Sequence, residues 1–283
     1  MRIHHLNCGT CCPAGGALFD GSSAGARAHL VCHCLLIESE AGLVLVDTGY
    51  GTRDVARPRQ RLAEFFIQLC NPQLRGEETA RAQVIARGFD PADVRHIVLT
   101  HLDFDHAGGI EDFPNATIHL LSREREVADA RAGGAFVGRR RYRPQQWDEA
   151  ENWRLYAAGG GERWFGFDAV RQLEGLPPEL LLVPLAGHSW GHAGVAIQED
   201  DGQWLLHAGD AYFYRGEVGS EDYHCPPGLR GYQKLMEVDR VARLANQRRL
   251  RRLSLDHAGE VRMFCAHDAV EFELLAGQES PVF

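Results

Sequence analysis

The sequence predicts an α/β fold built as a single domain. Short apolar segments that suit strands alternate with segments of helical periodicity along most of the chain. The 283 residues are enough for a substantial hydrophobic core, and α/β chains of this length often fold as one unit. Histidines and aspartates follow several of the apolar segments directly, which is where sites lie in α/β folds.

The first half of the chain carries the clearest alternation. Leu43–Val46 is an uninterrupted apolar run that ends at a turn, and Glu77–Arg87 is rich in helix formers and closes at Gly88. We therefore expect strands at 2–7, 30–37, 43–49, 93–100 and 117–121, helices at 62–69 and 77–87, and a short helix after Ser122.

Residues 131–178 interrupt this alternation with paired glycines, a run of arginines near 140 and three tryptophans, Trp147, Trp153 and Trp164. We interpret them as an inserted lid that folds over the site within one domain spanning 1–283. Beyond it we expect strands at 180–185, 194–198, 203–207 and 261–266 and a helix at about 230–248. Segments 43–47 and 204–210 both end an apolar strand on an aspartate, which suggests a duplicated sandwich.

Composition excludes several classes of partner. The formal net charge of -9 disfavours nucleic acid, and no stretch approaches the roughly 18 apolar residues of a membrane span. The N-terminus lacks the apolar segment of a secretory signal, so a cytoplasmic protein with reduced cysteines is expected. Arg139–Arg143 is interpreted as a solvated loop or a salt-bridged face.

The densest polar cluster is the segment from His101 to His106, which includes Asp103 and Asp105. Its four nitrogen or oxygen ligands follow a predicted buried strand. Two carboxylates this close would repel each other unless a positive charge lay between them, and a metal ion supplies that charge. His192, Asp210 and His267 follow later predicted strands, so we expect one sheet edge to bring them to the same place.

These residues, in this order, resemble the metallo-β-lactamase superfamily, and within it most closely the acyl-homoserine-lactone lactonases. The resemblance covers essentially the whole chain and implies a four-layer αββα sandwich. Carried over by position, it implies one metal on His101, Asp103 and His192, a second on Asp105, His106 and His267, and Asp210 bridging both. Asp47 would orient the ligands from outside the metal sphere.

One position departs from the family, which normally has a histidine where this chain has Asp103. With two divalent ions, three carboxylates and a bridging hydroxide, the formal charge of the site would be zero instead of plus one. Such a site should be a weaker Lewis acid and suit oxygen-preferring metals better. We therefore expect zinc, with manganese or iron competing for the site.

The resemblance implies hydrolysis of a carbonyl ester, most directly a lactone, through a metal-bridging hydroxide. The catalytic residues would be Asp105 and Asp210, with Tyr212 or Tyr214 contacting a small-molecule substrate. The position of the family tyrosine holds Phe213. A thioesterase, a β-lactamase, a phosphodiester or sulfate ester hydrolase, a di-iron redox protein and a metal-bound sensor stay open, as does a homodimer.

Overall fold

The computed structural model describes residues 1–130, 134–159 and 161–277, and these build two six-stranded sheets. The first sheet has the order β1 to β6: Arg2–Cys11, Leu30–Ser39, Gly42–Val46, Val94–Val98, Thr117–Leu121 and Trp153–Tyr156. The second has the order β12 to β7, and in chain order its strands are β7 Glu162–Trp164, β8 Phe167–Gln172, β9 Leu180–Pro184, β10 Ala193–Gln198, β11 Trp204–His207 and β12 Val261–Phe264.

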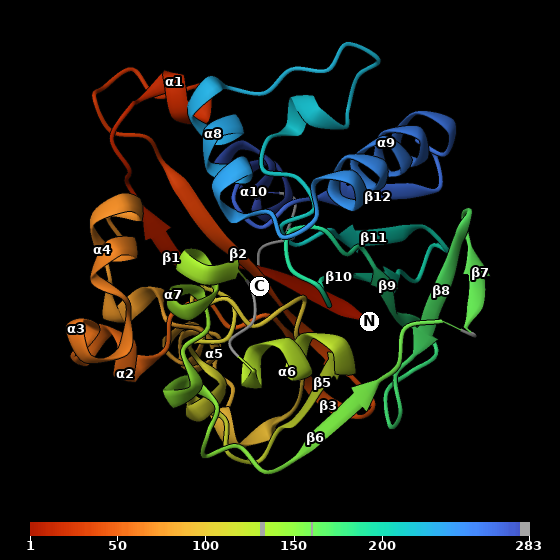
Figure 1. Cartoon of the computed structure of the whole chain (residues 1–283). Coiled ribbons are helices and arrows are strands. Elements are labelled where there is room, and N and C mark those ends of the chain that lie inside the picture. Colours follow the sequence, from red (N-terminus) through yellow and green to blue (C-terminus); the bar gives the residue numbers. More distant parts are fainter. Residues whose placement is uncertain (131–133, 160, 278–283) are drawn as a thin grey trace.

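Helices cover the outer face of each sheet (Figure 1). The helices of the described ranges are α1 Ala17–Asp20, α2 Thr52–Ala56, α3 Pro58–Arg61, α4 Glu64–Cys70, α5 Ala80–Ala86, α6 Ser122–Asp129, α7 Arg139–Arg141, α8 Pro227–Met236, α9 Arg240–Asp256 and α10 Ala269–Ala276. None of the helices within the described ranges is long and apolar enough to cross a bilayer.

Three apolar clusters separate the layers. One lies between the sheets and joins residues such as Val44 and Val98 to Leu182 and Val195. A second packs the first sheet against α5 and α6, and a third packs the second sheet against α9. Strand β2 is buried over eight successive residues, as expected for a strand covered on both faces. The predicted four-layer αββα fold is therefore confirmed.

Much of the segment expected to be an inserted lid extends the two sheets instead. Residues 153–172 form β6, β7 and β8, which extend the two sheets: β6 pairs with β5, and β8 pairs with β9. Trp147 and Trp164 are buried in the cores of the first and second sheet, respectively. Only the stretch around α7 reaches the predicted site, while positions 131–133 and 160 lie outside the described residues.

The helix expected at about 230–248 is two helices, α8 and α9. The chain breaks at Asp239, whose side chain accepts a hydrogen bond from the amide of Ala242 and so caps α9. The amides of Val238 and Asp239 donate to the carbonyl of Gly187 at 2.9 and 3.1 Å instead of continuing α8. The break therefore ties the end of α8 to the loop that carries His188.

Candidate metal centre

The ends of five strands deliver the candidate residues to one edge of the sandwich. In the first sheet β3 and β4 run parallel, and they lead into Asp47 and into the 101–106 loop. In the second sheet β11 and β12 are parallel, and β9 shares their direction because β10 is antiparallel to both β9 and β11. These three strands lead into the loops of Asp210, His267 and His188. Parallel strands end at the same edge, so the loops converge.

Asp47 orders the first of these loops. Its backbone is left-handed, with φ of 55°, and its carboxylate accepts hydrogen bonds from the amide and hydroxyl of Thr100 and from Nδ1 of His106, each at 2.8 Å. The Thr100 hydroxyl in turn accepts from Nδ1 of His101 at 2.9 Å. Both histidines therefore keep their Nε2 lone pairs turned toward the interior.

The surroundings of Asp47 also predict a pH effect. Burial alone would raise its pKa, but the neighbouring His106 lowers the pKa to about 2. A lowered carboxylate pKa contributes stability above the unfolded value of about 3.9, and that contribution is lost as pH falls through about 2.

We therefore expect Asp47→Asn, after treatment with a chelator, to be roughly 2–3 kcal/mol less stable than the unchanged protein at pH 5. The difference should shrink as pH falls to 2. Equilibrium unfolding in urea across this pH range measures it, with Asp222→Asn, an exposed aspartate, as the control. A gap that stays constant with pH would rule out this account of Asp47.

The first ligand group consists of His101, Asp103, His188 and Asp210, which are all buried. Nε2 of His188 lies 3.0 Å from Oδ2 of Asp103 and 3.3 Å from Oδ2 of Asp210. Nε2 of His101 lies 3.4 and 3.8 Å from the same two atoms. Two imidazoles and two carboxylates thus face one point.

The second ligand group consists of His106, Asp210 and His267, with Asp105 beside it. Oδ1 of Asp210 lies 3.3 Å from Nε2 of His106 and 3.1 Å from Nε2 of His267. Oδ2 of Asp105 is 3.9 Å from Nε2 of His267, and Cys32 forms a further cluster with these two residues. Asp210 therefore turns one oxygen to each group.

Unmatched polar atoms indicate that cations fit here. Nε2 of His101, Nε2 of His106 and Oδ1 of Asp210 are buried without a hydrogen-bond partner, which is costly inside a protein. The Nδ1 atoms of His101, His106 and His267 are hydrogen-bonded within the protein; that of His267, for example, donates to the carbonyl of Val31 at 2.7 Å. Although burial lowers it, the carboxylate of Asp210 raises the pKa of His267 to about 9. Positive charge is thus favoured at this point, and divalent cations would supply it.

His192, expected to be a ligand, lies elsewhere. Its Nδ1 donates to the carbonyl of Leu185 at 3.1 Å, and its Nε2 accepts the amide of Asp210 at 2.8 Å, so both ring nitrogens are used within the protein. Gly209, at φ of 54°, permits this approach, since a Cβ there would lie 2.6 Å from Nε2 of His192. His188, and not His192, turns its Nε2 toward Asp103 and Asp210.

The tyrosines after Asp210 also differ from expectation. The Tyr212 hydroxyl donates to Glu271 of α10 at 3.0 Å, so this buried side chain points away from the ligand groups. Phe213 instead stacks on His267, with ring centroids 5.2 Å apart. Tyr214 lines a small hollow with His267, while Tyr232 of α8 lines the cavity shared by Asp105 and His267. No sequence motif marks Tyr232, because it lies on α8, outside every strand-end loop that carries a candidate ligand.

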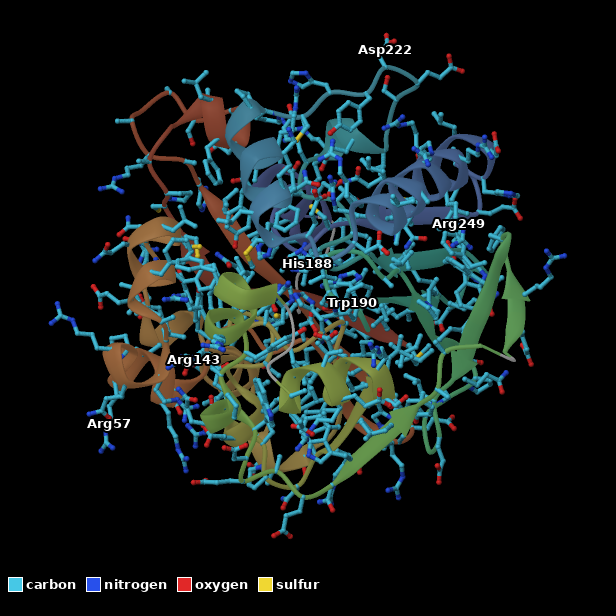
Figure 2. All side chains as sticks on the ribbon, viewed as in Figure 1. Arg57, Arg143, His188, Trp190, Asp222 and Arg249 are labelled. Carbon is cyan, nitrogen blue, oxygen red and sulfur yellow. The ribbon has the colours of Figure 1, made fainter. Side chains whose placement is uncertain are left out.

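Two further buried residues brace the site and were also missed. Glu124 of α6 accepts from the amides of Leu102 and Gly191 and from the hydroxyl of Ser189, so one carboxylate holds both ligand loops. Arg141 of α7, part of the arginine run interpreted as solvated or salt-bridged, is fully buried against Asp103. Figure 2 shows His188 well inside the molecule, whereas Arg57 and Asp222 project from its periphery.

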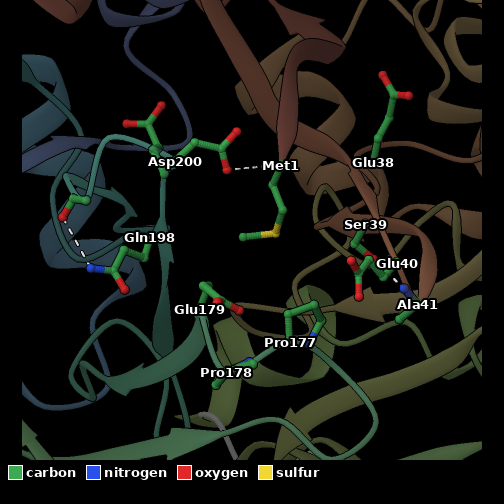
Figure 3. Close-up of a pocket in the computed structure, with 12 residues that line it drawn as sticks. Met1, Glu38, Ser39, Glu40, Ala41, Pro177, Pro178, Glu179, Gln198 and Asp200 are labelled. Carbon is green, nitrogen blue, oxygen red and sulfur yellow. Dashed lines mark hydrogen bonds and ion pairs between the residues drawn. The ribbon is translucent and has the colours of Figure 1, made fainter.

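Two hollows contrast in size and chemistry. The cavity beside Asp105 and His267 is narrow, about 20 Å³, and apolar side chains such as Phe19, Leu30 and Leu69 line it. A much larger hollow of about 1080 Å³ opens between the β2–β3 and β10–β11 turns and is lined by acidic residues, including Glu38, Glu179 and Asp200 (Figure 3). It contains no member of either ligand group, so the narrow cavity is the candidate substrate site.

Comparisons with known proteins identify the family of the chain. A family model described as the metallo-beta-lactamase superfamily matches residues 28–247. A Mycobacterium tuberculosis protein named "Probable metallo-hydrolase" is 38% identical over 275 residues, which are 97% of this chain and 82% of the relative. An N-acyl homoserine lactonase of Bacillus cereus is 27% identical over 80% of this chain and 86% of its own length.

Solved structures extend the likeness in fold. A B. thuringiensis AiiA variant with N-decanoyl-L-homoserine at its active site superimposes with a TM-score of 0.69 at 22% identity. The superposition covers 99% of this chain and 96% of that chain. The family model spans most of the chain, and the mycobacterial relative matches almost all of it. The chain therefore belongs to the metallo-beta-lactamase superfamily.

Proposed function

We propose that the protein is a dinuclear metal-dependent hydrolase of carbonyl esters, with a lactone carrying an apolar acyl chain as its substrate. The observation that carries the proposal is the position of Asp210, whose two oxygens face two separate groups of histidines and carboxylates. Relatives named N-acyl homoserine lactonases support the substrate class.

Two divalent cations, when bound, act as Lewis acids and lower the pKa of a bound water. His101, Asp103, His188 and Asp210 would hold one of them, and Asp105, His106, Asp210 and His267 the other. Zinc suits these imidazole ligands, and the Cys32 thiol near Asp105 and His267 adds a soft donor. Metal analysis of protein purified without added metal distinguishes zinc from manganese or iron.

The protein side chains would bind and orient the substrate. Phe19, Leu30 and Leu69 offer apolar contacts to an acyl chain, and the Tyr232 hydroxyl can donate a hydrogen bond close to Asp105 and His267. Because the cavity has room for little more than a water, these side chains must move when a substrate enters.

A substrate panel tests the proposal. Lactones, linear esters, thioesters, β-lactams, phosphodiesters and sulfate esters are each offered to protein loaded with zinc, manganese or iron, with Asp105→Ala as the inactive control. We expect the acyl lactones to have the highest kcat/KM. Turnover of another class alone would reassign the substrate, and full activity in Asp105→Ala would contradict the proposed site.

Tyr232→Phe tests the substrate contact. Loss of one hydrogen bond that strengthens in the transition state should lower kcat/KM on the preferred lactone roughly 10- to 100-fold, with the metal content unchanged. Steady-state kinetics together with metal analysis measures both quantities.

Tyr212→Phe is the matched control, because the Tyr212 hydroxyl is bonded to Glu271 instead. It should cost about 1 kcal/mol of stability and leave kcat/KM nearly unchanged. If Tyr212→Phe lowered kcat/KM and Tyr232→Phe did not, the assignment of the two tyrosines would be reversed.

A further inference from the structure

Arg141 makes an unusually complete set of contacts for a buried charge. Its Nε and Nη2 donate to Oδ1 and Oδ2 of Asp103, both at 2.6 Å, in a two-point pairing. Its Nη1 donates to the carbonyl of His188 at 3.0 Å and to that of Met236 at 2.9 Å. The side chain has no exposed surface, so protein atoms replace the water that a guanidinium needs.

The pairing leaves Asp103 able to serve the first ligand group. Each carboxylate oxygen has two lone pairs, and Arg141 occupies one on each. Oδ2 of Asp103 also lies 3.0 Å from Nε2 of His188 and 3.4 Å from Nε2 of His101. One side of the carboxylate thus faces the guanidinium and the other faces the two imidazoles.

We propose, on the basis of the proposed metal centre, that Arg141 is a positioning residue and a built-in counter-ion for Asp103, which lets a second carboxylate join Asp210 in the first ligand group. The charges of Asp103 and Arg141 cancel, so the pair presents the site with the net charge of a neutral imidazole. When the guanidinium of Arg141 is counted with the two divalent ions, the three carboxylates and the hydroxide, the formal charge of the site rises from zero to plus one. The charge of the site therefore no longer favours manganese or iron over zinc.

The same contacts connect the first ligand group to helices α7 and α8. Arg141 joins Asp103 to the backbone of His188 and to Met236, the last residue of the helix that carries Tyr232. The neighbouring Tyr142 pairs with Asp103 through an isolated backbone bridge and donates its hydroxyl to Glu124. Positioning of Asp103 therefore depends on residues 141–142, and not only on the 101–106 loop.

A four-protein set tests this proposal: the unchanged chain, Arg141→Met, Asp103→His and the double variant. Zinc affinity is measured by titration against a competing chelator, the ligand field by the visible spectrum of the cobalt(II)-loaded protein, and folding by circular dichroism. Arg139→Met is the matched control, because Arg139 is an exposed neighbour on α7. Arg141→Lys keeps the charge but loses the two-point pairing.

We expect Arg141→Met to bind the first zinc ion roughly 10- to 100-fold more weakly, since a partner that orients a ligand has an effect of this size. Asp103→His should also weaken it, because Arg141 then lacks its counter-ion. The double variant should regain most of the affinity, since a neutral imidazole needs no guanidinium, and its cobalt spectrum should show the added nitrogen ligand. Arg139→Met should leave both readouts unchanged.

Three results would overturn the proposal: unchanged zinc affinity in folded Arg141→Met, a double variant that binds no better than the weaker single variant, or full affinity in Arg141→Lys together with an unaltered cobalt spectrum. If Arg141→Met does not fold, the double variant decides the question alone. Failure of the proposed function is a separate result, because it would appear as tight zinc binding by the unchanged chain without lactone hydrolysis.

Discussion

Asp210→Asn is expected to lower kcat/KM on the preferred lactone by roughly a thousandfold or more and to reduce zinc binding at both positions. The two oxygens of Asp210 face the two ligand groups, so its loss would affect both cations. Their charge stabilisation in the transition state is worth several kcal/mol, and each 1.36 kcal/mol corresponds to a factor of ten in rate.

Zinc analysis after gel filtration and steady-state kinetics measure this effect. Asp222→Asn is the control, because this exposed aspartate lies far from the site at the periphery of the molecule (Figure 2). Two tightly bound zinc equivalents in Asp210→Asn, with near-normal kcat/KM, would show that the two groups do not share this carboxylate.

The second large effect separates His188 from His192. His188→Asn should bind one zinc equivalent instead of two and lose at least two orders of magnitude in kcat/KM, because its Nε2 faces Asp103 and Asp210. His192→Asn should keep both equivalents, because neither nitrogen of His192 is free for a metal. It should instead cost roughly 1–3 kcal/mol of stability, since buried hydrogen bonds are lost.

The pair is its own control, since both side chains are buried imidazoles from one glycine-bounded loop. Zinc stoichiometry and thermal unfolding are measured for each variant. If His192→Asn lost zinc while His188→Asn retained it, His192 would be the metal ligand and His188 would not.

The alternation of apolar segments predicted most of the fold, because a strand that is buried on both faces consists of consecutive hydrophobic residues. β2 and β9 are buried over most of their lengths and match their expected ranges closely. β6 and β7 were not predicted because they are edge strands; in β6, for example, Arg154 and Leu155 are exposed, and no periodic pattern marks the strand. The helices α2 and α3 were not predicted because five and four residues are too few to show a helical period.

The convergence at the site was predictable wherever a strand leads into a ligand, as for Asp105 or His267. The choice between His188 and His192 was not, because both flank the same loop and only its path decides which ring turns inward. Arg141 and Tyr232 reach the site from helices that the sequence places far away. Contacts of that kind depend on packing between elements, which hydrophobic periodicity does not record.

Diffraction at the zinc absorption edge from crystals of the zinc-loaded protein tests the central claim most directly. The account predicts two anomalous peaks, one on each side of the Asp210 carboxylate, with His188 Nε2 bound to the first and His267 Nε2 to the second. A single peak, or peaks that Asp210 does not share, would contradict it.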